Sequence, residues 1–233
     1  MFTETFVAKK AFFGEEERGY LFHMPENYDE SKKYPVVLFL HGAGERGDNN
    51  YDQLAIGIGT ALGDPESPLH DSFIIAPQVP LEKLWVNTPW DVGNYTVDDR
   101  EETPYLAGAV QIVRDTIANY PVDTSKVFVM GISMGGYGSW DTLARHSDLF
   151  VGGFICCGGA DLTKADIFKE KTIFTYHGTA DDIVPCFGTQ NVVKAIKDAG
   201  GEKITYREYE GMNHWTWDRA YSEFEDIKAL FNA

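Results

Sequence analysis

Short apolar runs separated by polar stretches dominate the sequence. The run 34–40 (YPVVLFL) is continuous and contains β-branched residues, which is typical of a strand buried on both faces of a sheet. The segment 203–209 alternates more and predicts a strand near the sheet edge, and two N-terminal segments predict strands that open the sheet in antiparallel orientation. The predicted strands are 5–12, 19–24, 34–40, 72–76, 126–130, 153–157, 172–176 and 203–209.

Amphipathic segments lie between the later strands. One begins at Thr103 and Pro104, because threonine is a good N-cap and proline suits the first helical position. Four acidic residues precede this start, where the helix dipole favours negative charge. The predicted helices are 104–120, 134–146, 188–199 and 218–231.

The alternation of strands and helices predicts an α/β fold with a mostly parallel central sheet and helices on both faces. We expect a single domain over residues 1–233, because α/β chains of this length often form one domain. No long insertion follows the central strands, so we expect no large lid. The segment 78–99 is long and aromatic, and long loops in compact domains are usually functional.

Composition limits the possible partners. The chain has 36 acidic against 20 basic residues, a net charge of −16, so we expect neither nucleic acid nor an anionic membrane as a partner. Cys156, Cys157 and Cys186 are expected to be free thiols, since their number and spacing do not suit a disulfide framework. Because the N-terminus lacks the layout of a signal peptide, we expect a cytoplasmic protein, or a secreted one whose leader has been removed. The oligomeric state is not indicated.

Ser133 stands between glycines directly after a predicted strand, in the sequence VFVMGISMGGYG. A strand, a tight turn with Gly-x-Ser-x-Gly and a following helix together predict a nucleophile elbow. Side chains at Gly131 and Gly135 would collide with neighbouring backbone in such a turn. The serine would lie at a helix N-terminus, where free N–H groups and the helix dipole favour an anion.

A serine hydroxyl needs a base to accept its proton, and in this architecture the chain order is serine, acid, histidine. His214 lies between the last predicted strand and the last helix, so it is the expected base. Asp181 and Asp182 both precede it on a loop after a strand, and we favour Asp181 as the acid that holds the imidazole. His177 precedes both acids and is expected to shape the end of its strand.

The developing oxyanion also needs hydrogen-bond donors. The N–H of Met134, the residue after the serine, is expected to supply one. The loop HGAGERGD after strand 34–40 is expected to supply the second from Ala43, with Gly42 as a neighbour that could share this role.

The chain resembles the α/β-hydrolase superfamily through five motifs in the expected order: HGAGERGDN, GISMGGYGSWD, CGGAD, HGTADDIVP and HWTWDRAY. It is similar to the branch described as predicted peptidases or putative esterases, near feruloyl esterases, polyhydroxybutyrate depolymerases and dienelactone hydrolases. The resemblance implies the triad Ser133, Asp181 and His214, with Ala43 and Met134 as oxyanion donors. Dienelactone hydrolases typically carry cysteine at the elbow, so the serine here argues against that activity.

We therefore expect a serine hydrolase that cleaves carboxylic esters through an acyl-enzyme, as a carboxylesterase or a feruloyl or carbohydrate esterase, on a small-molecule or carbohydrate-linked ester. A serine peptidase acting on small peptides and a non-catalytic binding protein on the same scaffold are the alternatives. No metal or organic cofactor is expected; a cation loop formed by Asp48, Asn49, Asn50 and Asp52 is a minor alternative. Among the aromatic residues, Trp85 and Trp215 are the expected substrate contacts, with Trp90 and Trp217 as further candidates.

Overall fold

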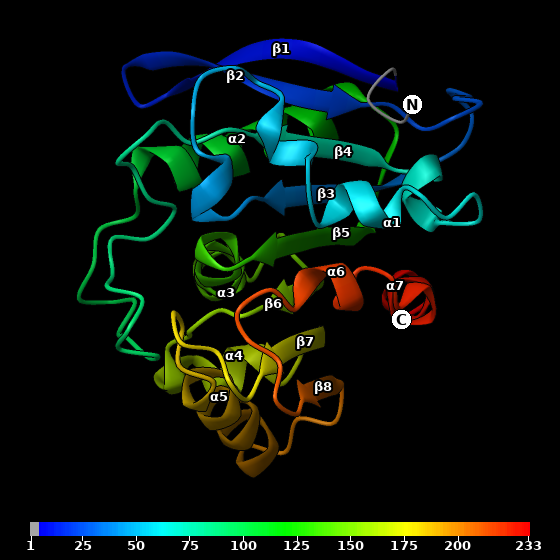
Figure 1. Ribbon diagram of the computed structural model, residues 1–233. Helices are drawn as coiled ribbons and strands as arrows, with labels where there is room; N and C mark the ends of the chain where they lie inside the picture. The colour runs from blue at the N-terminus through cyan, green and yellow to red at the C-terminus, as the bar shows by residue number, and fades with distance from the viewer. Residues whose placement is uncertain (1–4) are drawn as a thin grey trace.

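The computed structural model describes residues 5–233 and contains an eight-stranded sheet with the order β1-β2-β4-β3-β5-β6-β7-β8 (Figure 1). Strands β3 to β8 are mutually parallel, whereas β1 pairs with β2, and β2 with β4, in antiparallel orientation. The predicted fold class and its antiparallel opening are therefore confirmed. The strands are β1 (Phe6–Phe13), β2 (Glu16–His23), β3 (Tyr34–Leu40), β4 (Phe73–Pro77), β5 (Val122–Ile132), β6 (Gly152–Cys156), β7 (Thr172–Gly178) and β8 (Ile204–Tyr209).

Helices cover both faces of this sheet (Figure 1). The first face carries α2 (Pro104–Asn119), α3 (Met134–Arg145), α4 (Ala165–Phe168) and α5 (Phe187–Asp198). The second face carries α1 (Ile58–Ala61), α6 (Trp217–Ala220) and α7 (Phe224–Phe231). Short 3-10 helices lie in the connections: η2 (Ala43–Glu45), η3 (Asp52–Leu54), η4 (Pro68–Asp71) and η5 (Leu162–Lys164).

The central strand β3 shows why its sequence is apolar throughout. Successive side chains of a strand point to opposite faces, so Val36 and Leu38 pack into one core while Val37 and Phe39 pack into the other. All four side chains are fully buried. A polar residue at any of these positions would enter an apolar layer, which accounts for the continuous run from which the strand was predicted.

The last predicted helix differs from expectation, because it is divided into α6 and α7. The break brings Glu223 to the edge strand, where its carboxylate accepts a hydrogen bond from the Tyr209 hydroxyl at 2.8 Å and pairs with Arg207 at 3.0 Å. These contacts join residues that are distant in sequence, so the helical periodicity of 218–231 could not predict the break.

The parallel topology also determines where chemistry can occur. The carboxyl ends of parallel strands meet at one edge of the sheet, and ligands of open α/β sheets bind in the crevice there. The segments that follow β3, β5, β7 and β8 contain Ala43, Ser133, Asp181 and His214, respectively. Across residues 5–233, none of the helices combines the length and the apolar character that a membrane crossing requires.

Candidate active site

Ser133 occupies a strained turn between β5 and α3. Its backbone has φ 53° and ψ −116°, in a region that residues with a side chain rarely adopt. The turn is held by a hydrogen bond from the Ser133 N–H to the Cys156 carbonyl at 2.9 Å, and α3 begins at the next residue. The strand–turn–helix arrangement predicted from the sequence is therefore present.

The two glycines of the elbow are required by close backbone packing. A Cβ at Gly135 would overlap the carbonyl of Leu40 at the end of β3, and would lie 2.8 Å from the His41 carbonyl oxygen. A Cβ at Gly131 would overlap the Gly135 carbonyl and the Ser139 hydroxyl. Both positions thus exclude any larger residue, because α3 must approach β3 and β5 this closely to present the serine.

The structure brings the three predicted triad residues together. Ser133 Oγ lies 2.7 Å from His214 Nε2, and His214 Nδ1 lies 2.7 Å from Asp181 Oδ2. Because a carboxylate only accepts hydrogen bonds, Nδ1 carries the imidazole proton and Nε2 is free to accept the serine proton. Ser133 and His214 are 7% and 4% exposed, so the pair is shielded from bulk water but still reaches the cavity.

Asp181 is held by several hydrogen-bond donors, whereas Asp182 is exposed. The Oδ1 atom of Asp181 accepts hydrogen bonds from the N–H groups of Ile183 at 3.0 Å and Val184 at 2.8 Å, while its Oδ2 atom faces both His214 and His177. Burial acts to raise the pKa of this carboxyl, but the hydrogen bonds from His177, His214 and the Val184 N–H together outweigh it, and the pKa lies well below its usual range. Asp181 is therefore the anion that faces the imidazole.

The two predicted oxyanion donors both begin helical segments. Met134 is the first residue of α3 and Ala43 is the first residue of η2, so neither N–H has a preceding carbonyl within its own helix. A Cβ built on the adjacent Gly42 would lie 3.6 Å from Ser133 Cβ, which shows how closely this loop approaches the serine. The N–H groups of Ala43 and Met134 are therefore free to act as hydrogen-bond donors near the Ser133 hydroxyl.

The buried side chain of His41 holds the loop after β3 in place. His41 is fully buried, its Nε2 accepts the Val79 N–H at 2.9 Å, and its Nδ1 therefore donates to the Gly42 carbonyl at 2.6 Å. Burial lowers the pKa of His41 to about 4, so the ring is neutral near pH 7 and can make both bonds.

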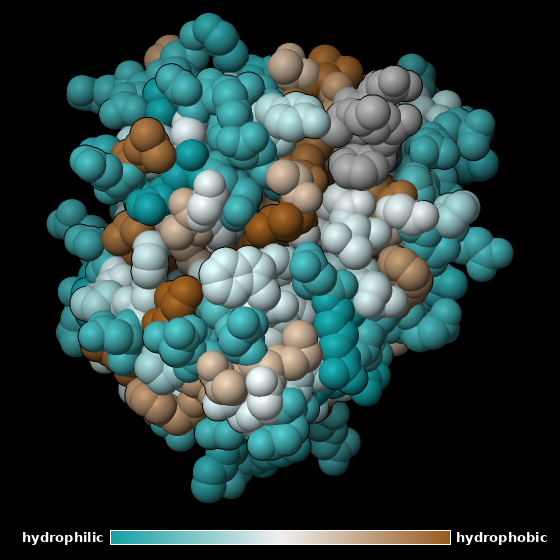
Figure 2. All heavy atoms as spheres, viewed as in Figure 1, coloured by the Kyte–Doolittle hydropathy of each residue, from teal (hydrophilic) through white to brown (hydrophobic). Residues whose placement is uncertain are grey.

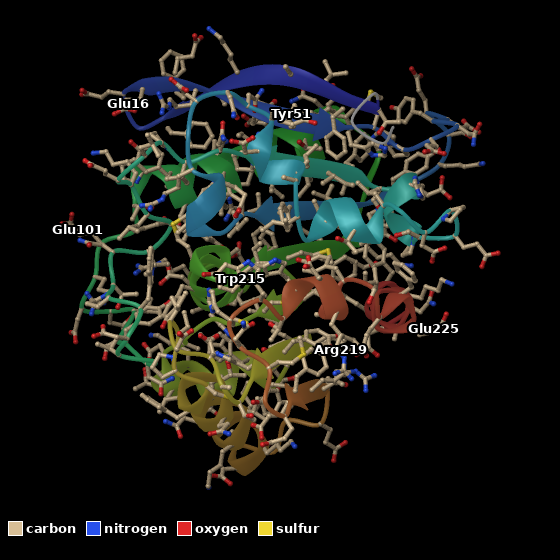
Figure 3. All side chains as sticks on the ribbon, in the orientation of Figure 1. Glu16, Tyr51, Glu101, Trp215, Arg219 and Glu225 are labelled. Carbon is tan, nitrogen blue, oxygen red and sulfur yellow. The ribbon has the colours of Figure 1, made fainter. Side chains whose placement is uncertain are left out.

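A cavity of about 210 Å³ opens next to Ser133. Figure 3 shows Trp215 near the middle of this face, and Figure 2 shows apolar surface there within a largely hydrophilic surround. The side chain of Trp215 is 55% exposed. The cavity is lined by Gly42, Ala43, Gly44, Glu45, Ile56, Trp90, Ile132, Ser133, Ile183, His214, Trp215 and Trp217.

The prediction that Trp85 contacts substrate is wrong. Its side chain is fully buried in the core and does not line the cavity. The indole N–H donates to the His41 carbonyl at 3.0 Å, so the residue supports the loop after β3 instead. Within the segment 78–99, Trp90 lines the cavity instead. Trp215 and Trp217, from the loop after β8 and the start of α6, line it as well.

Glu45 was not predicted as a site residue. It lines the cavity, its Oε2 is buried without a hydrogen-bond partner, and burial raises the pKa of its carboxyl. The sequence held one signal for it, namely its position two residues after Ala43 in the loop HGAGERGD. His177 was assigned only to the end of its strand, yet it contacts Asp181 directly.

The three cysteines are free, as predicted. Cys157 supports the loop that carries His214, since its thiol lies 2.7 Å from the Thr216 hydroxyl and 3.4 Å from the His214 carbonyl oxygen.

Among the described residues, Cys157, Asp181 and His214 lie close enough together to hold a metal ion, but Asp181 and His214 already hydrogen-bond within the triad. In the loop 48–52, Asn49 Oδ1 accepts from nearby N–H groups and its amide donates to Asp52, so these groups bond to one another.

A serine on a strained strand–helix turn, bonded to a histidine that is bonded to an aspartate at the carboxyl edge of a parallel sheet, defines an α/β hydrolase. A family model described as phospholipase/carboxylesterase matches residues 27–231. The chain belongs to this family.

Known structures and curated proteins agree with this assignment. A thermostable esterase superposes with a TM-score of 0.85 and 31% identity, over 98% of this chain and 63% of that one. The ferulic acid esterase of Anaeromyces mucronatus shares the fold, with a TM-score of 0.65 and 21% identity over 97% of this chain and 91% of that one. The bifunctional acetylxylan esterase/xylanase of Neocallimastix patriciarum is 26% identical over 165 residues, which is 70% of this chain but 22% of that protein. The chain thus spans less than two thirds of the first and the last of these relatives.

Proposed function

We propose that this protein is a serine carboxylesterase that hydrolyses its substrate through an acyl-enzyme. The observation that carries the proposal is the continuous hydrogen-bonded series from Ser133 Oγ through the His214 ring to Asp181, with 2.7 Å at each step. Membership of the phospholipase/carboxylesterase family supports the choice of a carboxylic ester as the bond that is cleaved.

In the first half of the reaction, Ser133 Oγ attacks the ester carbonyl while His214 Nε2 accepts its proton. The negative charge that develops on the carbonyl oxygen is stabilised by the N–H groups of Ala43 and Met134. Each such donor contributes roughly 3 kcal/mol to the transition state. His214 then donates its proton to the leaving alcohol, and the acyl group remains on the serine.

In the second half, water replaces the alcohol and the same steps run again. His214 activates the water, the oxyanion forms at the same amides, and the acid is released with recovery of the Ser133 hydroxyl. The imidazole carries a positive charge in both transition states, and the Asp181 carboxylate stabilises it and holds the productive tautomer.

The size of the cavity and the tryptophan at its rim favour a substrate in which an ester joins a small acyl group to a sugar. Its volume of about 210 Å³ lies below the ~300–1,000 Å³ typical of sites that enclose a drug-sized ligand, so it suits the acyl half alone. Trp215, exposed at the rim, offers a flat aromatic surface for a sugar or an aryl group outside the cavity. The acetylxylan esterase activity named for the fungal relative is consistent with this class of substrate.

A substrate panel with Ser133→Ala as control tests this proposal. The wild-type protein should hydrolyse p-nitrophenyl acetate and release acetate from acetylated xylan or ferulate from methyl ferulate, with little action on a dipeptide anilide. Ser133→Ala should retain the far-UV circular dichroism spectrum and lose the esterase activity. Turnover retained by Ser133→Ala, or a clear preference for the anilide, would overturn the proposal.

A further inference from the structure

Glu45 places a carboxyl group in the wall of the cavity beside Ser133. Its side chain is half-buried, and its Oε2 atom is buried without a hydrogen-bond partner. The adjacent Arg46 does not neutralise this carboxyl, because its guanidinium donates to two backbone carbonyls, those of Ala43 and Lys83. The proposed mechanism assigns no role to Glu45.

The carboxyl of Glu45 lies close to the position where the ester reacts. A Cβ built on Gly42 would lie 2.9 Å from Glu45 Oε2 and 3.6 Å from Ser133 Cβ. One carbon atom at this position would therefore contact both side chains. A group of the substrate that lies next to the ester attacked by Ser133 is thus within reach of Glu45.

An unpaired carboxyl at a cavity wall costs folding free energy, because it has left water without gaining a protein partner. Burial raises the pKa of the Glu45 carboxyl, and the opposing effect of the Gly42 and Glu45 N–H groups does not offset it. A polar group that is left in this state beside a catalytic serine is typical of a binding site, in which the ligand supplies the missing partner.

The chemistry of the carboxyl limits which part of a substrate it can bind. An ester group has only acceptor atoms, and a carboxylate accepts hydrogen bonds but cannot donate them. The partner must therefore be a group that bears a hydrogen, such as a hydroxyl elsewhere in the substrate. A small acyl group such as acetyl has no hydroxyl, whereas a sugar carries hydroxyls on the carbons that flank the esterified one.

We propose that Glu45 is a specificity-determining residue that accepts a hydrogen bond from a free hydroxyl on the alcohol half of the substrate, next to the esterified carbon. The inference rests on the proposed function and narrows its substrate class to monoesters of vicinal diols, such as a partly acetylated sugar. Trp215, which is 55% exposed at the rim of the same cavity, is placed to contact the apolar face of that sugar (Figure 3).

Two pairs of esters test the proposal, because the members of each pair differ only in the exchange of a hydroxyl for a methyl group. Ethylene glycol monoacetate and propyl acetate differ on the alcohol half, whereas ethyl hydroxyacetate and ethyl propionate differ on the acyl half. The measured quantity is the ratio of kcat/KM within each pair, hydroxyl ester over methyl ester.

Glu45→Met removes the acceptor and keeps a side chain of similar length. We expect the ratio of the alcohol pair to fall about tenfold relative to the wild-type protein, and the ratio of the acyl pair to stay the same. Glu45→Gln should reduce the alcohol ratio less, since its amide oxygen still accepts a hydrogen bond. Asp48→Asn is the matched control: it removes an exposed carboxyl from the same loop, outside the cavity, and should change neither ratio.

Unchanged ratios in a folded Glu45→Met variant, with both members of each pair hydrolysed more slowly, would show that Glu45 only supports the loop and would overturn the proposal. A change confined to the acyl pair would place the hydroxyl on the acid half and would also overturn it. Circular dichroism establishes that the variant is folded, and Glu45→Gln decides the question if Glu45→Met does not fold.

A titration of Ser133→Ala protein measures recognition without hydrolysis. Tryptophan fluorescence should report the binding of a partly acetylated xylo-oligosaccharide, because three tryptophans line the cavity. Adding Glu45→Met should raise Kd about tenfold for this ligand and should not change Kd for the fully acetylated oligosaccharide, which has no free hydroxyl. If the wild-type protein hydrolyses no ester, the proposed function fails and this titration alone decides the role of Glu45, with an equal Kd in both proteins as the contradicting result.

Discussion

Replacing Gly135 with alanine is expected to impair the elbow more than any comparable change outside it. The new methyl group would overlap the Leu40 carbonyl and lie 2.8 Å from the His41 carbonyl oxygen. Both obstacles are backbone atoms at the end of β3, so no side chain can rotate away. The start of α3 and the end of β3, from which the loop with Ala43 continues, must separate by more than 1 Å to restore a normal contact.

This displacement affects both activity and stability. Ser133 and the Ala43 amide lie on opposite sides of the opened contact, and a misplacement of 1 Å can reduce the rate about 10²-fold. Overpacking costs about 1–3 kcal/mol of folding free energy, and in a chain of this size each kcal/mol lowers Tm by about 2–4 °C. We therefore expect kcat/KM to fall about 100-fold and Tm to fall by several degrees.

The assay is hydrolysis of p-nitrophenyl acetate together with thermal unfolding followed by circular dichroism. Gly47→Ala is the matched control, since a Cβ there would meet no backbone atom and would contact only the Gln78 side chain, whose Nε2 would lie at 3.2 Å. A Gly135→Ala variant with wild-type kcat/KM and wild-type Tm would refute the reasoning that close packing of α3 on β3 sets the geometry of the site.

Three further predictions follow from the site. Asp181→Asn should lower kcat about 10⁴-fold in the p-nitrophenyl acetate assay, because the imidazole loses its productive tautomer, while the exposed Asp182→Asn should stay within about twofold; the reverse ranking would exchange their roles. Trp215→Ala should raise KM for acetylated xylan with no change in Tm. Trp85→Ala should instead lower the free energy of unfolding by about 3–5 kcal/mol in a denaturant titration and reduce the hydrolysis of all esters alike. A substrate-selective effect of Trp85→Ala would indicate that Trp85 contacts substrate after all. The pKa of His41 is lowered to about 4 in the folded state, so between about pH 6.5 and 4 its ring binds a proton only when the protein unfolds. The free energy of unfolding should therefore decrease as pH falls through this range, by up to roughly 3 kcal/mol. A His41→Gln variant should show a flatter dependence over that range in urea titrations, and an unchanged slope would contradict the assignment.

The sequence predicts the parts of this fold that depend on local patterns. The strand 34–40 was placed correctly because burial on both faces demands a continuous apolar run, and α3 followed from the elbow. The order of serine, acid and histidine follows from the architecture, so those positions could be named without coordinates.

The features that the sequence missed depend on contacts between distant segments. Trp85 is buried because its indole N–H bonds to the carbonyl of His41, and nothing within residues 78–99 encodes that partner. The contact of His177 with Asp181 depends on how the loop after β7 folds back onto the strand end. The burial of the Glu45 carboxyl depends on how η2 lies against the cavity wall, which the loop sequence alone does not indicate.

The central claim, that His214 activates the Ser133 hydroxyl, is tested most directly by covalent labelling with a fluorophosphonate. Tandem mass spectrometry of the digested adduct should locate a single phosphonyl group on Ser133, and the labelling rate should fall by a factor of roughly 10³ or more in a folded His214→Ala variant. A label on another residue, or an equal labelling rate without the histidine, would contradict the account.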